Sequence, residues 1–175
     1  MQQSKSVATF GGGCFWCTEA CLQNVKGMLK VVSGYAGGTD KTPNYKKICD
    51  GSSDHAEVIQ CTFDEAVVSY HTVLKAFFKS HDPTTLNRQG NDSGPQYRSI
   101  ILYHDQAQHD VAKKMIQELN THIYGGKVVT ILQKFEHFYP AEEYHQNYFN
   151  TNPEQGYCRG VIKPKLAKFL QTLQE

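Results

Sequence analysis

A run of three glycines and a cysteine, within residues 11–17 (GGGCFWC), separates two segments with different hydrophobic patterns. The residues just before it, 7–10 (VATF), form a short apolar run that predicts a strand. From Cys14 to about Val25, apolar residues recur at helical spacing, with polar residues such as Glu19 between them. Because glycine permits the backbone angles of a tight turn, the sequence predicts a strand, a sharp turn and a helix that begins at Cys14.

The same reasoning predicts the elements that follow. We expect strands at 29–35, 57–63, 98–103 and 128–135, helices at 70–78, 107–119, 141–150 and 164–173, and longer loops at 37–54, 81–95 and 150–160. The first six elements run strand, helix, strand, strand, helix, strand, which is the split βαβ pattern. We therefore predict an α+β fold, a ferredoxin-like two-layer sandwich around a mixed or antiparallel sheet with long loops.

The length of the chain limits the number of domains, and its net charge and hydropathy limit the classes of partner. The chain has 175 residues, enough for one domain with a core and short for two, so we expect a single domain over residues 1–175 and a monomer. Lys+Arg is 18 and Asp+Glu is 17, and a net charge of +1 predicts no nucleic-acid partner. Residues 1–6 are polar and no apolar run approaches membrane-spanning length, so we expect no membrane partner and a cytoplasmic location.

Cys14 is the strongest candidate for chemistry. The first turn of a helix presents unpaired N–H groups and a partial positive charge, and both favour a thiolate, so we expect a lowered pKa for this cysteine. Cys17 lies one helical turn further on, at the spacing of Cys-x-x-Cys redox pairs, which close a disulfide. The alternative is that both are small core residues, as free cysteines often are.

The other cysteines give little support to a metal site. The chain has six, at positions 14, 17, 21, 49, 61 and 158. Neither Cys49 nor Cys61 has a close cysteine partner, and no histidine pair has the spacing of a zinc finger, so we predict no metal. We interpret Cys21, Cys49 and Cys61 as structural residues.

Six short blocks occur in order along the chain: residues 13–16 (GCFW), 33–38 (SGYAGG), 55–57 (HAE), 87–92 (NRQGND), 96–99 (QYRS) and 144–146 (YHQ). Together they resemble the A-type peptide methionine sulfoxide reductases, and the resemblance extends from about residue 10 to residue 158. One tetrapeptide would be modest support for a family, whereas six blocks in the family's order are strong support.

The resemblance implies a peptide-methionine (S)-S-oxide reductase, an oxidoreductase of protein repair under oxidative stress that uses no cofactor. Its substrates are methionine S-sulfoxide in oxidised proteins or as the free amino acid, and its reductant is thioredoxin. A thiolate attacks the sulfoxide sulfur, the oxygen leaves with a proton, and a second thiol converts the resulting sulfenic acid to a disulfide. The matched blocks assign the nucleophile to Cys14, the proton donor to Glu57, the oxygen-holding phenols to Tyr35 and Tyr97, a polar site residue to Asp92, and the apolar wall for the substrate methyl group to Phe15 and Trp16.

The residues themselves support part of this assignment. Glu57 is in phase with the apolar residues of its predicted strand, so its carboxyl is expected on the buried face, where burial raises the pKa and keeps a proton available near neutral pH. The alternative is a glutamate that points to water. Tyr35 and Tyr97 have hydroxyls that can donate to a developing oxyanion, yet each is equally an ordinary core tyrosine, and Asp92 alone would be a turn residue.

The cysteine that closes the disulfide has two candidates. Residues 156–158 (GYC) resemble the family's C-terminal block with the recycling cysteine, which favours Cys158 as the first to react. Many family members have glycine at the position of Cys17, so we expect Cys17 to form a later or competing disulfide with Cys14.

Two other functions remain open on the sequence. A thioredoxin-like disulfide oxidoreductase would use Cys14 and Cys17 without a sulfoxide, and it would need a cis-proline facing the thiols, for which no proline here is an obvious candidate. A binding module with core cysteines would show an ordinary rate of alkylation at Cys14.

Overall fold

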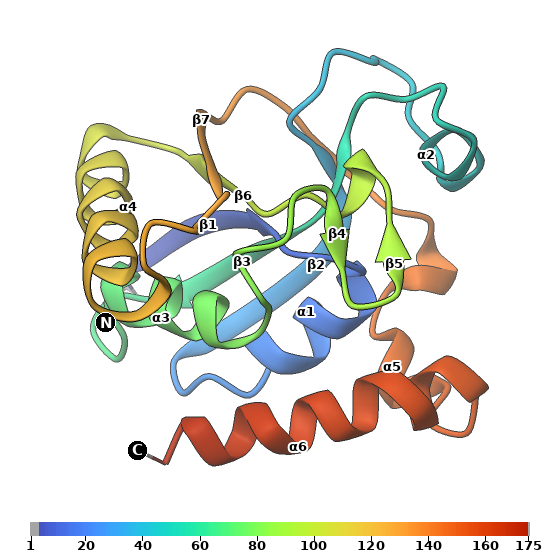
Figure 1. Ribbon diagram of the computed structural model, residues 1–175. Helices are drawn as coiled ribbons and strands as arrows, with labels where there is room; N and C mark the ends of the chain where they lie inside the picture. The colour runs from blue at the N-terminus through green and yellow to red at the C-terminus, as the bar shows by residue number, and fades with distance from the viewer. Residues whose placement is uncertain (1–3, 175) are drawn as a thin grey trace.

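The computed structural model describes residues 4–174, and its centre is a six-stranded sheet (Figure 1). Its strands are β1 (Lys5–Gly11), β2 (Met28–Ala36), β3 (Ala56–Asp64), β6 (Ile100–Tyr103), β7 (Ile131–Lys134) and β8 (Phe138–Pro140). The order across the sheet is β7-β6-β1-β3-β2-β8. β3 pairs antiparallel with β1 and β2, and β1 pairs antiparallel with β6. With helices α1 (Phe15–Leu22) and α3 (Tyr70–Lys79) between these strands, the predicted split βαβ order and α+β class are confirmed.

Two short strands extend this sheet at its edges. β7 pairs parallel with β6 and lies inside the predicted strand at 128–135. β8 pairs antiparallel with β2 and was not expected, because its three residues carry no hydrophobic period. Its place depends on a glycine in β2, since a Cβ at Gly34 would lie 2.5 Å from the ring of Phe138.

The main core lies between the sheet and the helices. Phe10 of β1 stacks on Phe77 of α3 with ring centroids 4.7 Å apart, and Ile59 and Phe63 of β3 face the same side, as their alternation predicts. Helix α4 (Gln106–Leu119) packs on this core through Met115. A π-helical turn (Asn120–Tyr124) follows directly at the C-terminal end of α4. The opposite face of the sheet carries a smaller cluster, formed by Ala36, Ala56, Val58, Ile100 and Leu102.

Helix α1 is buried on nearly all sides, and this includes the polar residues that stand between its apolar residues. Glu19 is 2% exposed and Thr18 is 1% exposed. The cause is long-range packing, because α1 contacts β2 and β3 on one side and α5 (Tyr148–Thr151) and α6 (Lys163–Thr172) on the other. Figure 1 shows α6 as an outer layer beneath α1.

Three segments that were predicted as a helix or as loops have a structure that differs from the prediction. The helix expected at 141–150 is a 3₁₀ turn (Glu143–His145) and the short α5, because Asn147 between them has a left-handed φ of 54°. The loop expected at 150–160 ends in a π-helical turn (Cys158–Ile162) that leads into the predicted C-terminal helix, α6. The polar loops contain α2 (Tyr45–Asp50), the hairpin of β4 (Arg88–Gln89) and β5 (Asp92–Ser93), and a 3₁₀ turn (Pro95–Tyr97).

Among residues 4–174, no helix has both the length and the apolar composition needed to cross a membrane. The first half of the polar N-terminal segment predicted at 1–6 lies outside the described residues.

Candidate active site

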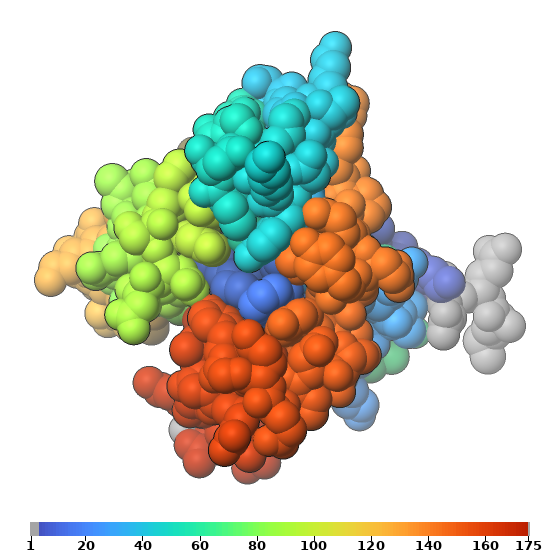
Figure 2. Space-filling view, turned by 90° about the vertical axis from the view of Figure 1, so that its right-hand side faces the viewer, coloured from blue at the N-terminus to red at the C-terminus, as the bar shows by residue number. Residues whose placement is uncertain are grey.

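Cys14 lies where the predicted turn meets the predicted helix. Gly13 has a left-handed φ of 92°, and Cys14 is the N-cap residue of α1, with extended backbone angles. Its carbonyl accepts the first helical hydrogen bonds, from the N–H groups of Cys17 at 3.0 Å and Thr18 at 3.4 Å. In Figure 2 the N-terminal segment, drawn in blue, forms the floor of a hollow that four later segments of the chain surround.

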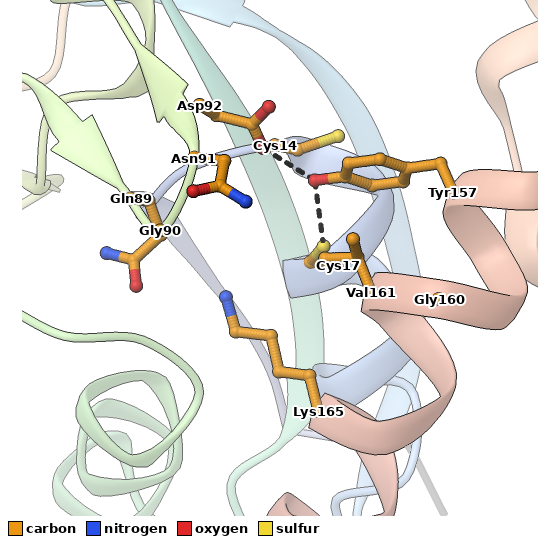
Figure 3. Close-up of a pocket in the computed structure, with 10 residues that line it drawn as sticks. All are labelled: Cys14, Cys17, Gln89, Gly90, Asn91, Asp92, Tyr157, Gly160, Val161 and Lys165. Carbon is orange, nitrogen blue, oxygen red and sulfur yellow. Dashed lines mark hydrogen bonds between the residues drawn. The ribbon is translucent and has the colours of Figure 1, made fainter.

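Cys14 and Cys17 line a cavity of about 380 Å³ (Figure 3). The β4–β5 hairpin forms one wall with Gln89, Gly90, Asn91 and Asp92, and the C-terminal segment forms the other with Tyr157, Gly160, Val161 and Lys165. Lys165 extends from α6 toward the middle of this cavity. The two thiols of the Cys-x-x-Cys spacing therefore open onto the same space.

The electrostatics of the two thiols differ from the expectation. Burial raises the pKa of Cys14 well above its ordinary value, and the Cys17 side chain and the charge of Glu57 raise it further, while the N–H of Trp16 lowers it. The interaction with Cys14 lowers the pKa of Cys17 to about 7, against the effect of burial, and Lys165 also lowers it. The prediction of a lowered pKa for Cys14 is thus wrong, because burial outweighs the helix start.

Tyr157 connects the thiols to the hairpin wall. Its hydroxyl donates a hydrogen bond to Oδ2 of Asp92 at 2.6 Å and lies 3.6 Å from Sγ of Cys17. Asp92, predicted in the site, is therefore in it, while Tyr157 was not selected from the sequence. Its position beside Cys158 in the GYC block was the available signal.

Glu57 lies beneath the start of α1, on the buried face of β3 that its phase predicts. It is 2% exposed, and its Oε1 accepts a hydrogen bond at 3.1 Å from the backbone N–H of Phe15, the residue after Cys14. Burial raises the pKa of Glu57 to about 8, and the charges of Asp92 and Cys17 act in the same direction. The side chain is mainly a carboxylic acid at neutral pH, so the expected raised pKa is confirmed.

The two predicted phenols lie close enough to this carboxyl for its charge to raise the pKa of both. Tyr35 is directly opposite Glu57 in the β2–β3 register, so both side chains are on the same face. Tyr35 is buried, and its hydroxyl donates a hydrogen bond to Oε1 of Glu142 at 2.9 Å. Tyr97 is half-buried in the 3₁₀ turn after the hairpin, and burial raises its pKa, as do the charges of Glu57 and Asp92.

Phe15 and Trp16 have different positions in the site. Phe15 is fully buried, with its ring centroid 5.8 Å from that of Tyr35. Trp16 is half-buried, and its indole stacks on Tyr148 with ring centroids 3.8 Å apart and an interplanar angle of 7°. The indole N–H donates to Nδ1 of His145 at 3.0 Å. Trp16 is therefore the accessible residue of the predicted apolar wall, and Phe15 belongs to the buried core against which Trp16 packs.

The remaining cysteines are also free thiols. Cys158 is fully buried and packs in a cluster with Cys17, Ala20 and Ile162, and it is not among the described residues that line the cavity. Cys21 and Cys61 are buried, which agrees with a structural role. Cys49 is exposed on α2, so burial does not support its interpretation as a structural residue, which stays a prediction.

Within the described part of the chain, no group of three or more histidine, cysteine, aspartate or glutamate side chains is arranged to hold a metal ion. The chemistry available around Cys14 is that of two thiols, a buried carboxylic acid and phenols. Such a set is able to attack an electrophilic sulfur, protonate a leaving oxygen and form a disulfide.

Comparison with known proteins adds the family. The profile of the family described as "Peptide methionine sulfoxide reductase" matches residues 6–175. A curated relative, the peptide methionine sulfoxide reductase MsrA of Leptospira borgpetersenii serovar Hardjo-bovis, is 56% identical over 165 residues, which are 94% of this chain and 93% of the relative.

Solved structures give the same result. The reduced form of Mxr1 from Saccharomyces cerevisiae superposes with a TM-score of 0.82 at 35% identity, covering 88% of this chain and 89% of Mxr1. Mxr1 in complex with Trx2 superposes with a TM-score of 0.60 at 25% identity, covering 85% and 89%.

Proposed function

The chain belongs to the peptide methionine sulfoxide reductase family, and we propose that the site around Cys14 carries out the reaction of that family. The enzyme reduces methionine sulfoxide, in oxidised proteins or as the free amino acid, to methionine, and a thioredoxin regenerates it. The complex of the structural relative Mxr1 with Trx2 supports this choice of reductant. The family match over residues 6–175 supports this function over a thioredoxin-like disulfide oxidoreductase.

Cys14 is the nucleophile, and the observation that carries this role is its position at the start of α1, open to the same cavity as Cys17. The pair bears one negative charge near neutral pH, mainly on Cys17. As Cys14 attacks, its proton passes to Cys17. The Cys14 sulfur then forms a bond to the sulfoxide sulfur of the S epimer.

Glu57 is the acid of this step. Its proton passes to the sulfoxide oxygen, and Glu57 becomes a carboxylate. The resulting hydroxyl moves from the substrate sulfur to the Cys14 sulfur as the bond between the two sulfurs breaks, so that methionine leaves with its sulfur reduced and Cys14 becomes a sulfenic acid. The raised pKa of Glu57, about 8, and its contact with the N–H of Phe15 support this role. Tyr35 and Tyr97, which lie near Glu57, donate to the oxygen as its charge develops. For Tyr35 this requires its hydroxyl to leave Glu142.

Cys17 resolves the sulfenic acid first, in the reverse of the order that the C-terminal block favours. It attacks the Cys14 sulfur, the disulfide forms, and the hydroxyl leaves with the Cys17 proton as water. Cys158, which packs against Cys17, then attacks the Cys17 sulfur and releases Cys14. The disulfide of Cys17 and Cys158 is the bond that the thioredoxin reduces by two electrons.

The substrate methyl group lies against Trp16, supported by Phe15, and Asp92 and the hairpin border the polar side of the cavity. A single catalytic domain over residues 1–175, a monomeric state and a cytoplasmic location complete the proposal.

The test is mass spectrometry of the disulfides formed after one equivalent of methionine S-sulfoxide, without reductant. We expect Cys14→Ser to form no methionine. We expect Cys158→Ser to release one methionine and stop at a disulfide of Cys14 and Cys17, and Cys17→Ser to accumulate the Cys14 sulfenic acid.

A disulfide of Cys14 with Cys158, formed as fast in Cys17→Ser as in the unchanged protein, would show instead that Cys158 resolves first. Full turnover by Cys14→Ser would refute the site. The R epimer is the control substrate, and it should release no methionine.

A further inference from the structure

Glu19 is a buried carboxylate on α1 that the mechanism above does not use. It lies three residues after Trp16 and is 2% exposed. Its two oxygens accept hydrogen bonds from consecutive backbone N–H groups, that of Asn147 at 3.1 Å and that of Tyr148 at 3.3 Å. A carboxylate that is buried needs such donors, and here both come from a single turn of another segment.

The two N–H groups belong to the beginning of α5. The first N–H groups of a helix have no partner within it, and an N-cap side chain normally accepts one of them. Asn147 is the N-cap residue of α5, but within the described chain its side chain makes no such bond. Its Oδ1 instead accepts from Gln23 at 3.2 Å and Asn150 at 2.7 Å. Glu19 therefore supplies from α1 the cap that α5 lacks.

The residue held in this way, Tyr148, contacts the proposed substrate wall through Trp16. Tyr148 stacks on Trp16 at 3.8 Å, and His145, three residues earlier, accepts the indole N–H. Residues three apart on a helix lie on neighbouring positions of one face, so Trp16 and Glu19 contact the same segment together. The path of residues 145–148 across α1 is thus defined at two points, by the indole and by the carboxylate.

We propose that Glu19 is a positioning residue for methionine sulfoxide binding: its carboxylate holds the start of α5 so that Tyr148 keeps Trp16 in the orientation that receives the substrate methyl group. This inference rests on the proposed function. Burial raises the pKa of Glu19 to about 7, and the N–H groups of Asn147 and Tyr148 oppose that rise, so the two bonds favour the ionised form.

The test uses Glu19→Gln, which keeps the size of the side chain but turns an amide N–H₂ toward one of the two donors. Trp16 is the only tryptophan of the chain, so its fluorescence reports on this position alone. We expect a shifted emission spectrum and a KM for a methionine sulfoxide peptide that rises about tenfold, because a lost charge-assisted hydrogen bond corresponds to about that factor in binding. We expect kcat to change by less than about twofold, because the lost contact stabilises the bound substrate and the transition state equally.

Gln23→Ala is the matched control. Gln23 is on the same helix and contacts the same Asn147, but through an exposed side-chain contact, so neither fluorescence nor KM should change. If Glu19→Gln does not fold, Glu19→Asp replaces it, since its shorter carboxylate cannot reach both donors, and the same changes are expected.

A double variant tests the route through Tyr148. In a Tyr148→Leu background, Glu19→Gln should raise KM no further, because the stack it positions is already gone. The proposal is wrong if Glu19→Gln lowers the melting temperature but leaves Trp16 emission and KM unchanged, or if the two KM effects multiply. The emission spectrum of Trp16 is measured without turnover, so it tests the position of Trp16 independently of activity. If the protein without substitutions had no reductase activity, that result would refute the proposed function separately.

Discussion

Replacing Glu57 with glutamine separates the proposed catalytic role of this carboxyl from the free energy that its burial costs. Glutamine has nearly the shape of the protonated acid, and its amide oxygen is able to accept the N–H of Phe15 that Oε1 accepts at 3.1 Å. It has no proton to give to a sulfoxide oxygen. We therefore expect turnover to fall by about 10²-fold or more, the usual contribution of a general acid.

The effect on stability depends on pH, and its size follows from the pKa. Burial raises the pKa of Glu57 from 4.5 to about 8, so the folded chain binds this proton more tightly than the unfolded chain does. The stability that results is fully present below pH 4.5 and is lost as the pH rises to about 8. Since one pKa unit corresponds to about 1.4 kcal/mol, the loss approaches about 5 kcal/mol. Glutamine does not ionise, so the variant loses no stability from this position as the pH rises.

Urea unfolding at pH 5 and pH 9 measures this difference. At pH 5 the free energies of unfolding of Glu57→Gln and the unchanged protein should agree within about 1 kcal/mol. At pH 9 the variant should be the more stable by several kcal/mol. Glu65→Gln is the control, because Glu65 is exposed and its replacement makes the same chemical change without altering the buried carboxyl. If the free energies of unfolding of Glu57→Gln and the unchanged protein differed by the same amount at both pH values, Glu57 would not be a buried acid with a raised pKa.

Three further predictions concern the thiols, a phenol and the core. Lys165→Met should raise the pH of half-maximal alkylation of Cys17 by about half a unit, since a partly screened ammonium charge is removed, and Lys168→Met should not. Tyr35→Phe should lower the free energy of unfolding by about 1–2 kcal/mol in a urea titration, through its lost bond to a carboxylate, and should lower kcat/KM. Phe77→Ala should cost about 3–5 kcal/mol in the same assay, because it leaves a cavity beside Phe10, with activity retained where the protein is folded.

Elements whose form depends on local pattern were predictable from the sequence. The residues of α3 that repeat at helical spacing, from Val73 to Phe77, are buried against the sheet, as their period requires. The order of the central strands and the buried face of β3 followed in the same way. The surroundings of α1 did not, because the segments that bury Glu19 come from more than 120 residues later in the chain.

The left-handed backbone conformation of Asn147 could not be predicted from the sequence either. The break between the 3₁₀ turn and α5 depends on a left-handed Asn147, and the amino-acid sequence around it is compatible with a continuous helix. This break places Tyr148 on Trp16, so the shape of the proposed substrate wall could not be derived from periodicity. In contrast, the blocks at 13–16 and 87–92 contain Cys14 and the hairpin residues that line the cavity, because these blocks mark chemistry and not packing.

The protonation of Cys14 shows why a helix start alone does not determine reactivity. The N–H of Trp16 lowers the pKa of this thiol, as expected at a helix start, but burial and the nearby charge of Glu57 raise it by more. The carboxyl is affected by the other thiol, because the charge of Cys17 raises the pKa of Glu57. A buried site disfavours a second negative charge, so ionisation of the thiol pair keeps the carboxyl protonated. The site near neutral pH then holds a thiolate and an acid together, which are the two forms that reduction of a sulfoxide requires.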